Sequence, residues 1–210
     1  MSRIQEIDQL IQQGRGKKVC ETIQAAMNEG ISAADILREG MLPAMSAIGE
    51  KFKNNEVFVP EVLVAARAMN MGMALLKPYM ADCGIEPAGT AVIGTVRGDM
   101  HDIGKNLVKM MIEGLRVVDL GVDVSPEKFL EAAEENHADI ICCSALLTTT
   151  MGEIKNILAY LEARNVRGKY KVMIGGAPVS QSYCDAIGAD YYTPDAASAA
   201  DVAYRICRQA

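Results

Sequence analysis

The residues with the clearest chemical potential lie between Arg97 and Asn106, in the segment RGDMHDIGKN. His101 is one of two histidines in the chain; it lies two residues after Asp99 and directly before Asp102. A carboxylate can orient an imidazole for general-base catalysis. The same pair can serve a metal, since a ligating histidine commonly donates its second ring N–H to a carboxylate. His101 is therefore the first candidate for chemistry.

Three interpretations of His101 follow from the residues alone. It can be a surface loop residue with no role, or a general base that activates Ser144 or one of the threonines at positions 148–150. The chain has no G-x-S-x-G motif, which disfavours a hydrolase. As a metal ligand, one histidine is too few for zinc, which takes three or four protein ligands. It is enough to supply one axial ligand to a metal held in a macrocycle.

The elements that must position this segment lie in the second half of the chain. Short apolar runs predict five strands, each followed by a helix, at residues 90–96, 116–120, 138–146, 171–175 and 189–193. Strands of this kind predict an α/β domain with a doubly wound parallel sheet, Rossmann-like or flavodoxin-like, buried on both faces. Ligands bind such sheets outside the carboxyl ends of the strands. The His101 loop and the segments SALLTTTM, GGAPVS and YTPDAAS all follow strands, so we expect them to converge.

The first half of the chain has a helical period and no strand signal. Four helices are expected: one ending at Gly14, one ending at Gly30, one beginning after Ser32 and one beginning near Pro60. Pro43 predicts a kink or break in the third helix, and the fourth is expected to stop around Pro78. Residues 81–89 have no period and form the expected linker. The sequence therefore predicts a four-helix-bundle domain at residues 1–88 and an α/β domain at residues 89–210.

The composition narrows the class of protein. The 210 residues carry a net charge of −6 with both signs interspersed, so there is no basic stripe for nucleic acid and no preference for an anionic membrane surface. No run of 18 apolar residues predicts a membrane span, and the polar N-terminal segment lacks the apolar core of a secretory signal. We therefore expect a cytoplasmic protein. The six cysteines form no C-x-x-C pair and are expected to be reduced thiols.

Three short motifs and one longer segment together resemble a known family. GDMHDIGKN contains D-x-H-x-x-G at Asp99, His101 and Gly104, and SALLTTT and GGAPVS follow at suitable distances. This set resembles the cobalamin-binding signature of corrinoid methyl-carrier proteins of methylamine, methanol and methoxyl methyltransferase systems, and of methionine synthase. Residues 40–78, from GMLPAM to ALLKP, resemble the helical cap domain that precedes the cobalamin domain in those proteins. The resemblance covers about residues 4–205.

The resemblance implies a cobalamin or related corrinoid bound base-off and His-on. His101 would be the lower axial ligand of cobalt, Asp99 would hydrogen-bond the other ring nitrogen, and Thr150 would complete the relay where methionine synthase has a serine. The slot for the displaced nucleotide tail would be lined by Gly104, Ser144, Thr148, Gly175 and Gly176. The other implied cofactor-binding residues are Met100, Asp102, Ile103 and Leu146 near the ligand, and Phe52 and Val59 in the cap. The two cap residues have a second interpretation as ordinary bundle core.

The resemblance also implies a function. The chain would be a carrier subunit with no catalytic residue of its own, holding a methyl group on cobalt. It would take the methyl group from a substrate-specific methyltransferase, and a second methyltransferase would pass it to a thiol or tetrahydrofolate. A reductive activase would be a further partner, whereas nucleic acid and membrane would not. The alternative is a cobalamin-binding sensor or storage module without turnover.

Two other classes explain less of the chain. The small subunit of an adenosylcobalamin mutase would share the motif but would not need the cap. A flavodoxin-like response or nucleotide domain leaves His101 unexplained, and the chain has no G-x-G-x-x-G. One departure from the family pattern stands out: the chain is two residues shorter than usual between Asn106 and Asp119. We therefore expect the helix after the motif to end early, near Glu113.

Overall fold

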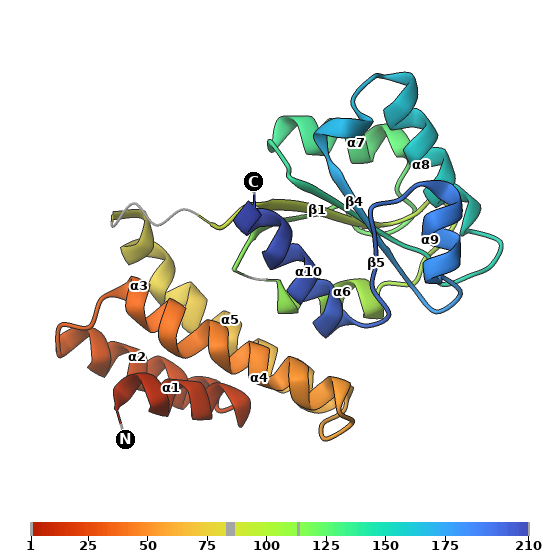
Figure 1. Ribbon diagram of the computed structural model, residues 1–210. Helices are drawn as coiled ribbons and strands as arrows, with labels where there is room; N and C mark the ends of the chain where they lie inside the picture. Colours follow the sequence, from red (N-terminus) through yellow and green to blue (C-terminus); the bar gives the residue numbers. More distant parts are fainter. Residues whose placement is uncertain (1, 83–86, 113, 210) are drawn as a thin grey trace. The chain divides into compact units, whose positions relative to one another are not determined.

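The structure is a computed structural model that describes residues 2–82, 87–112 and 114–209. The chain forms two compact units, Met1–Glu86 and Pro87–Ala210. In the described residues the first unit is helical and the second is α/β (Figure 1).

The helical unit contains the four predicted helices. They are α1 (Arg3–Gln12), α2 (Gly16–Asn28), a continuous run of α3 (Ala33–Asp35), η1 (Ile36–Met41) and α4 (Leu42–Lys53), and α5 (Val59–Asp82). The expected cap at Ser32 is present, because its side chain accepts the Asp35 N–H. Gly14 and Gly30 follow α1 and α2 with φ of +67° and +88°, the left-handed geometry that ends a helix. Ile7, Ile11 and Ile23 are fully buried in the core of this unit.

The two prolines expected to disturb helices behave differently. Before Pro43 the helix widens into the π-helical segment η1, and the Leu42 N–H donates to the Leu37 carbonyl, five residues earlier. A π turn absorbs the disturbance without ending the helix. The prediction that α5 stops around Pro78 is wrong, because the helix continues to Asp82 with Pro78 inside it. Proline removes one N–H donor, and the rest of this long helix tolerates that loss.

Residues 59–79 of α5 are long and apolar enough, by length and composition alone, to cross a membrane. Within the unit, however, α5 packs against α2 and buries Val62, Ala65 and Met69. A bundle needs such an apolar face in its core helix, so this packing accounts for part of the composition; Leu63 and Val64 of the same helix remain exposed.

The α/β unit contains the five predicted strands in one parallel sheet of order β2-β1-β3-β4-β5. The strands are β1 (Thr90–Thr95), β2 (Arg116–Asp119), β3 (Ile140–Ser144), β4 (Lys171–Gly175) and β5 (Tyr191–Tyr192). The sheet is flavodoxin-like, and such a sheet binds ligands where the order reverses, at the carboxyl ends of β1 and β3. β3 is shorter than predicted because the Leu146 N–H donates to the Asp99 side chain and pairs with no neighbouring strand. β5 is short and pairs with β4 alone.

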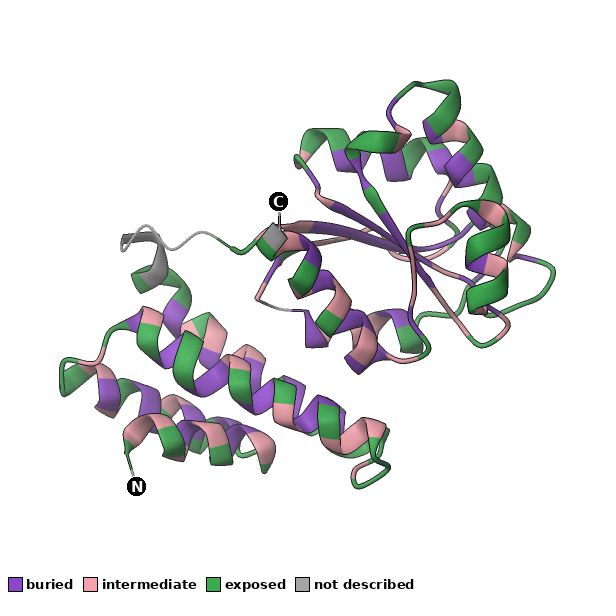
Figure 2. Ribbon diagram, in the orientation of Figure 1, coloured by how far each residue is buried: buried purple, intermediate pink, exposed green. Residues whose placement is uncertain are grey.

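Helices cover both faces of the sheet. They are α6 (Ile103–Met111), α7 (Pro126–Glu135), α8 (Gly152–Ala163), the 3-10 turn η2 (Arg167–Lys169), α9 (Gln181–Ile187) and α10 (Ala196–Gln209). α6 packs with α10 and α7 packs with α8, on opposite faces of the sheet (Figure 1). α6 ends two residues before the predicted end near Glu113, which itself lies outside the described residues. Figure 2 shows that the central strands are mostly buried, so the sheet is a firm platform for the loops at its carboxyl edge.

Candidate functional site

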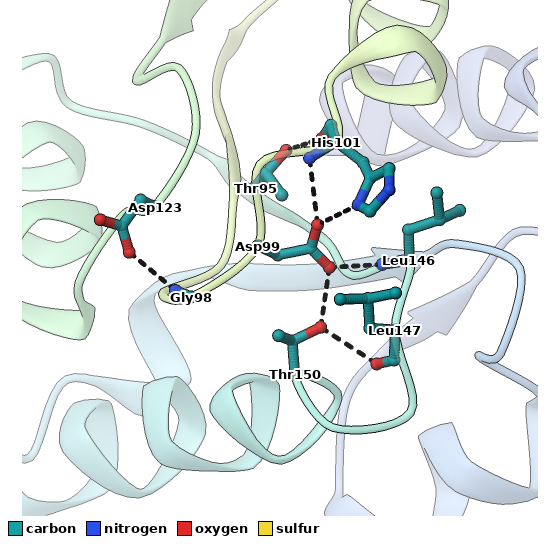
Figure 3. A network of polar contacts seen from close by, with 8 residues as sticks. All are labelled: Thr95, Gly98, Asp99, His101, Asp123, Leu146, Leu147 and Thr150. Carbon is teal, nitrogen blue, oxygen red and sulfur yellow. Dashed lines mark hydrogen bonds and ion pairs between the residues drawn. The ribbon is translucent and has the colours of Figure 1, made fainter.

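The His101 loop leaves the sheet at the carboxyl end of β1 and enters α6 two residues after the histidine. Gly98 has φ +77°, and the Asp99 N–H donates to the Val96 carbonyl, which closes a tight turn. This turn buries the Asp99 side chain completely and leaves the His101 side chain 49% exposed. His101 Nδ1 lies 2.7 Å from Asp99 Oδ1 (Figure 3). The predicted Asp99–His101 contact is therefore present.

Asp99 accepts four hydrogen bonds. Its Oδ1 receives the ring N–H and the backbone N–H of His101, at 2.7 and 3.1 Å. Its Oδ2 receives the Leu146 N–H at 2.8 Å and the Thr150 hydroxyl at 2.7 Å. Burial alone would raise the pKa of Asp99, but these donors, led by the Leu146 N–H, hold it far below its usual range.

The ionised Asp99 determines which ring nitrogen of His101 is free. A carboxylate only accepts, so the proton of the neutral imidazole lies on Nδ1 and the lone pair lies on Nε2. The His101 side chain is half exposed and lines a cavity, so a ligand can reach the ring. The arrangement is that of a histidine prepared to ligate a metal through Nε2.

Two threonines support the loop from beneath. The Thr150 hydroxyl, at the start of α8, is buried and lies within 3.0 Å of the Leu147 carbonyl as well as of Asp99. Thr95, the last residue of β1, is fully buried and donates its hydroxyl to the His101 carbonyl at 2.8 Å. His101 is thus held through both its ring and its backbone.

A cavity of about 590 Å³ lies beside His101, within the α/β unit. Ile93, Cys142 and Met173 occupy matching positions on β1, β3 and β4 and form one row of its lining. Ser144 and Gly175 lie two residues further along their strands, toward the carboxyl edge. α6 contributes Gly104, Lys105 and Val108, and α10 contributes Ala196 and Ala199. A largely apolar cavity with a few polar groups at its mouth is typical of a cofactor site.

Most of the predicted site residues come together here. The cavity lining includes His101 and eight further predicted residues: Met100, Asp102, Ile103, Gly104, Ser144, Leu146, Gly175 and Gly176. Asp99 and Thr150 lie buried behind the histidine. Thr148 is exposed in the loop after β3 and is not part of the lining, so the structure does not place it in the slot. Phe52 and Val59 belong to the helical unit, and their contact with a cofactor stays a prediction.

Two glycines of the cavity lining differ in whether the fold itself leaves room for a side chain at their position. Gly176 has φ +131°, and a Cβ there would lie 1.9 Å from the Ala145 carbonyl oxygen, so the fold itself demands glycine. A Cβ on Gly104 would meet no atom within 4 Å. The protein therefore does not need glycine at position 104, but a ligand in the cavity gains room from it. This free space beside the open Nε2 fits a bulky group that carries a metal.

The donor set also fits a macrocycle. In the part of the chain that the structure describes, no group of three or more His, Cys, Asp and Glu side chains could hold a metal ion. A metal at His101 must therefore bring most of its ligands with it, as cobalt does in a corrin ring.

The sequence did not indicate several residues of the site. Thr95 and Asp123 contact the ligand loop, and Thr193 lines the cavity from the end of β5. Lys105 is buried in the cavity wall and donates to Asp119 Oδ1 at 2.7 Å. Burial opposes ionisation of Asp119, yet Lys105, the Gly121 N–H and Lys109 lower its pKa to about 2. Thr95 bonds a backbone carbonyl six residues away, whereas the contacts of Asp123 and Lys105 join residues 25 and 14 positions apart. No local motif marks any of them.

A flavodoxin-like sheet with a histidine loop above a large cavity defines a corrinoid-binding type of domain. Residues 89–202 match the family described as B12 binding domain, and residues 3–77 match a second family of the same description. The chain belongs to the family of B12-binding corrinoid proteins.

Relatives and solved structures agree with this membership. The chain is 41% identical to a corrinoid protein of Desulfitobacterium hafniense over 98% of both chains, and 43% identical to trimethylamine corrinoid protein 1 of Methanosarcina acetivorans over 89% of this chain and 87% of that protein. Among solved structures, it resembles a chain of the methanol:cobalamin methyltransferase complex of Methanosarcina barkeri, with a TM-score of 0.86 and 30% sequence identity. The match covers 99% of this chain and 80% of that chain. It also resembles a cobalamin-binding protein of D. hafniense with a TM-score of 0.83, 28% identity and coverage of 97% and 98%.

Proposed function

We propose that this chain is a methyl carrier that binds a corrinoid base-off and ligates its cobalt through His101 Nε2. Bound corrinoid supplies a cobalt centre that accepts and gives up a methyl group. The observation that carries the proposal is the position of His101: Nδ1 is bonded to buried, ionised Asp99, and the half-exposed His101 side chain lines a cavity of about 590 Å³.

The protein's own residues orient the histidine that would ligate the cobalt. Asp99 keeps Nδ1–H oriented, which strengthens Nε2 as a ligand, and the Thr150 hydroxyl and Leu146 N–H fix the carboxylate in turn. These contacts would fix both the tautomer and the orientation of the histidine that holds the cobalt.

The relatives support a methyltransferase as the partner. They include trimethylamine and dimethylamine corrinoid proteins, and the solved relative belongs to a methanol:cobalamin methyltransferase complex. We propose a substrate-specific methyltransferase as methyl donor, with methylamines as the first substrates to examine. A second methyltransferase that passes the methyl group to a thiol or tetrahydrofolate, and a reductive activase, complete the proposed set of partners.

An absorption spectrum tests the ligand assignment. The full chain is mixed with hydroxocobalamin and desalted, and the variants H101A and H137A are treated in parallel. We expect the wild type and H137A to retain a histidine-ligated, base-off spectrum and H101A to lose it. His137 is the matched control because it follows α7 at the opposite edge of the sheet. A protein that retains no corrinoid, or an H101A spectrum identical to that of the wild type, would contradict the proposal.

Turnover distinguishes the carrier from a sensor or storage module. The reduced, corrinoid-loaded chain is incubated with trimethylamine and a trimethylamine methyltransferase taken from the system of a relative. A carrier takes up the methyl group, and the methyltransferase releases the dimethylamine that remains; with a sensor or storage module, neither the methylated corrinoid nor dimethylamine forms. The H101A variant serves as the control in the same assay.

A further inference from the structure

Asp123 lies in the loop between β2 and α7 and contacts the ligand loop in two ways. Its Oδ1 accepts the Gly98 N–H at 2.7 Å (Figure 3). Its own N–H donates to the Asp99 carbonyl at 3.1 Å. Asp123 therefore bonds the Arg97–Gly98 and Asp99–Met100 peptide units, which lie on either side of the Gly98–Asp99 peptide unit, although Gly98 and Asp123 are 25 residues apart.

These contacts act at the flexible point of the loop. Gly98 has φ +77° and no side chain, so little in the residue itself fixes the orientation of the Gly98–Asp99 segment. Asp99 carries the carboxylate that orients His101 Nδ1 at 2.7 Å, and a rotation of its backbone moves that carboxylate. The Gly98 N–H lies 2.7 Å from Asp123 Oδ1, at the short end for a bond donated by a backbone N–H, so this acceptor constrains the loop closely.

The backbone conformation of Asp123 suits these two contacts. Its φ is +54°, in the left-handed region, which aspartate adopts more readily than most residues with a side chain. From this conformation its carboxylate accepts the Gly98 N–H and its own N–H donates to the Asp99 carbonyl. Asp123 therefore bonds the ligand loop through its side chain and its backbone at once.

We infer that Asp123 is a positioning residue for the cobalt ligand: it fixes Asp99, and Asp99 fixes His101. The inference rests on the proposed function, because it concerns how firmly His101 is presented to the metal. Asp123 touches neither the ring of His101 nor the cavity lining. Its role is to keep the Asp99 carboxylate within hydrogen-bond distance of His101 Nδ1 when His101 binds the metal.

Two substitutions of Asp123 separate this role from a general effect on folding. D123G removes the carboxylate but keeps the backbone N–H bond to Asp99, and glycine is relaxed at φ +54°. D123N keeps an oxygen acceptor at the same place, and asparagine also tolerates the left-handed region. H137G is the matched control, because His137 has φ +50° but lies at the opposite edge of the sheet.

The measurement is made on the full chain loaded with cob(II)alamin. The histidines of the protein are labelled with 15N, so that electron paramagnetic resonance distinguishes a histidine nitrogen on cobalt, which splits each line into a doublet, from the cofactor's own benzimidazole nitrogen, which gives a triplet. The spectrum then gives the ratio of histidine-ligated to other protein. We expect D123G to lower this ratio about tenfold, the scale of change typical for lost second-layer contacts at metal sites. D123N and H137G should stay close to the wild type, and thermal unfolding should show that all variants are folded.

The outcomes of the two proposals are distinguishable. If the wild type itself shows no doublet from a histidine nitrogen, the assignment of His101 as cobalt ligand fails. If the wild type shows the doublet and folded D123G retains the same ratio, only the positioning role of Asp123 is overturned. A loss in D123N equal to that in D123G would also overturn it, because the acceptor would then not be what matters.

Discussion

At the scale of single residues, Asp99 links the site to the stability of the protein. Its carboxylate is fully buried, and four donors hold its pKa well below the usual range. A carboxyl group whose pKa is lower in the folded than in the unfolded chain stabilises the fold most when it is ionised in both states. Its contribution is therefore complete above the unfolded pKa of about 3.9, and it is lost as the pH falls further toward the lower folded pKa.

The variant D99N tests this pH dependence. We expect it to lower the free energy of unfolding by about 1–3 kcal/mol at pH 7, because a charged acceptor is lost and buried donors are left poorly paired. The difference between wild type and D99N should shrink as the pH falls from 5 to 3. Urea unfolding at several pH values measures both quantities. The exposed Asp102 is the matched control, and D102N should change stability by less than about 0.5 kcal/mol. A difference that stays constant with pH would contradict the argument.

The sequence could predict Asp99, His101 and Thr150 because a motif of residue types marks them. Thr95 and Asp123 act through backbone atoms of the loop, at His101 and Gly98. A hydroxyl or carboxylate that bonds a backbone group leaves no pattern of partner residue types. Such residues become visible only when the sheet has brought their strands together.

At the scale of the elements, an ion cluster joins α6 to the end of β2. Asp119 Oδ1 accepts from Lys105 at 2.7 Å, and Oδ2 accepts from Lys109 at 3.0 Å. The two lysines differ in environment, since the side chain of Lys105 is 2% exposed and that of Lys109 is 42% exposed. A buried partner is costly to remove, whereas an exposed ion pair contributes little.

The paired variants K105M and K109M measure this difference. K105M should lower the free energy of unfolding by about 2–3 kcal/mol, less than for a fully buried pair because Asp119 retains Lys109 and the Gly121 N–H. K109M should cost less than about 1 kcal/mol. Denaturant unfolding of both variants at neutral pH provides the comparison. Equal effects would show that the burial of Lys105 does not strengthen the contact between α6 and Asp119.

The sequence predicted the presence and type of the strands and helices more accurately than the residues at which they end. Apolar runs and helical periods identified all five strands and the helices that surround them. The end of α5 did not follow, because a long helix can continue through Pro78 with one hydrogen bond lost. The end of β3 did not follow either, since the Leu146 N–H pairs with a side chain and not with a strand.

At the scale of the whole molecule, the cavity is a product of sheet register. Ile93, Cys142 and Met173 share one row only because β1, β3 and β4 align in parallel at those residues. Each of these residues is almost completely buried and looks like strand core, and their types give no sign that the row contributes to the lining of a cavity. The lining of the cavity therefore could not be predicted residue by residue, although its place at the carboxyl edge could.

The link between this cavity and the stability of the protein gives a last test. A ligand that binds only the folded state adds about 2.7 kcal/mol to the free energy of unfolding at 100 times its dissociation constant. We expect hydroxocobalamin to stabilise the wild type in this way. G104A should fold as well as the wild type or better, by up to about 1 kcal/mol, since its new methyl group meets no protein atom.

That methyl group projects into space that the cofactor needs, so G104A should gain less from the ligand. A tenfold weaker affinity would remove about 1.4 kcal/mol of the stabilisation at the same concentration. G168A is the matched control, because a Cβ on Gly168 is also unopposed but that residue does not line the cavity. Urea unfolding with and without hydroxocobalamin measures the effect. If G104A and G168A gained as much as the wild type, the corrinoid would not occupy the cavity beside Gly104.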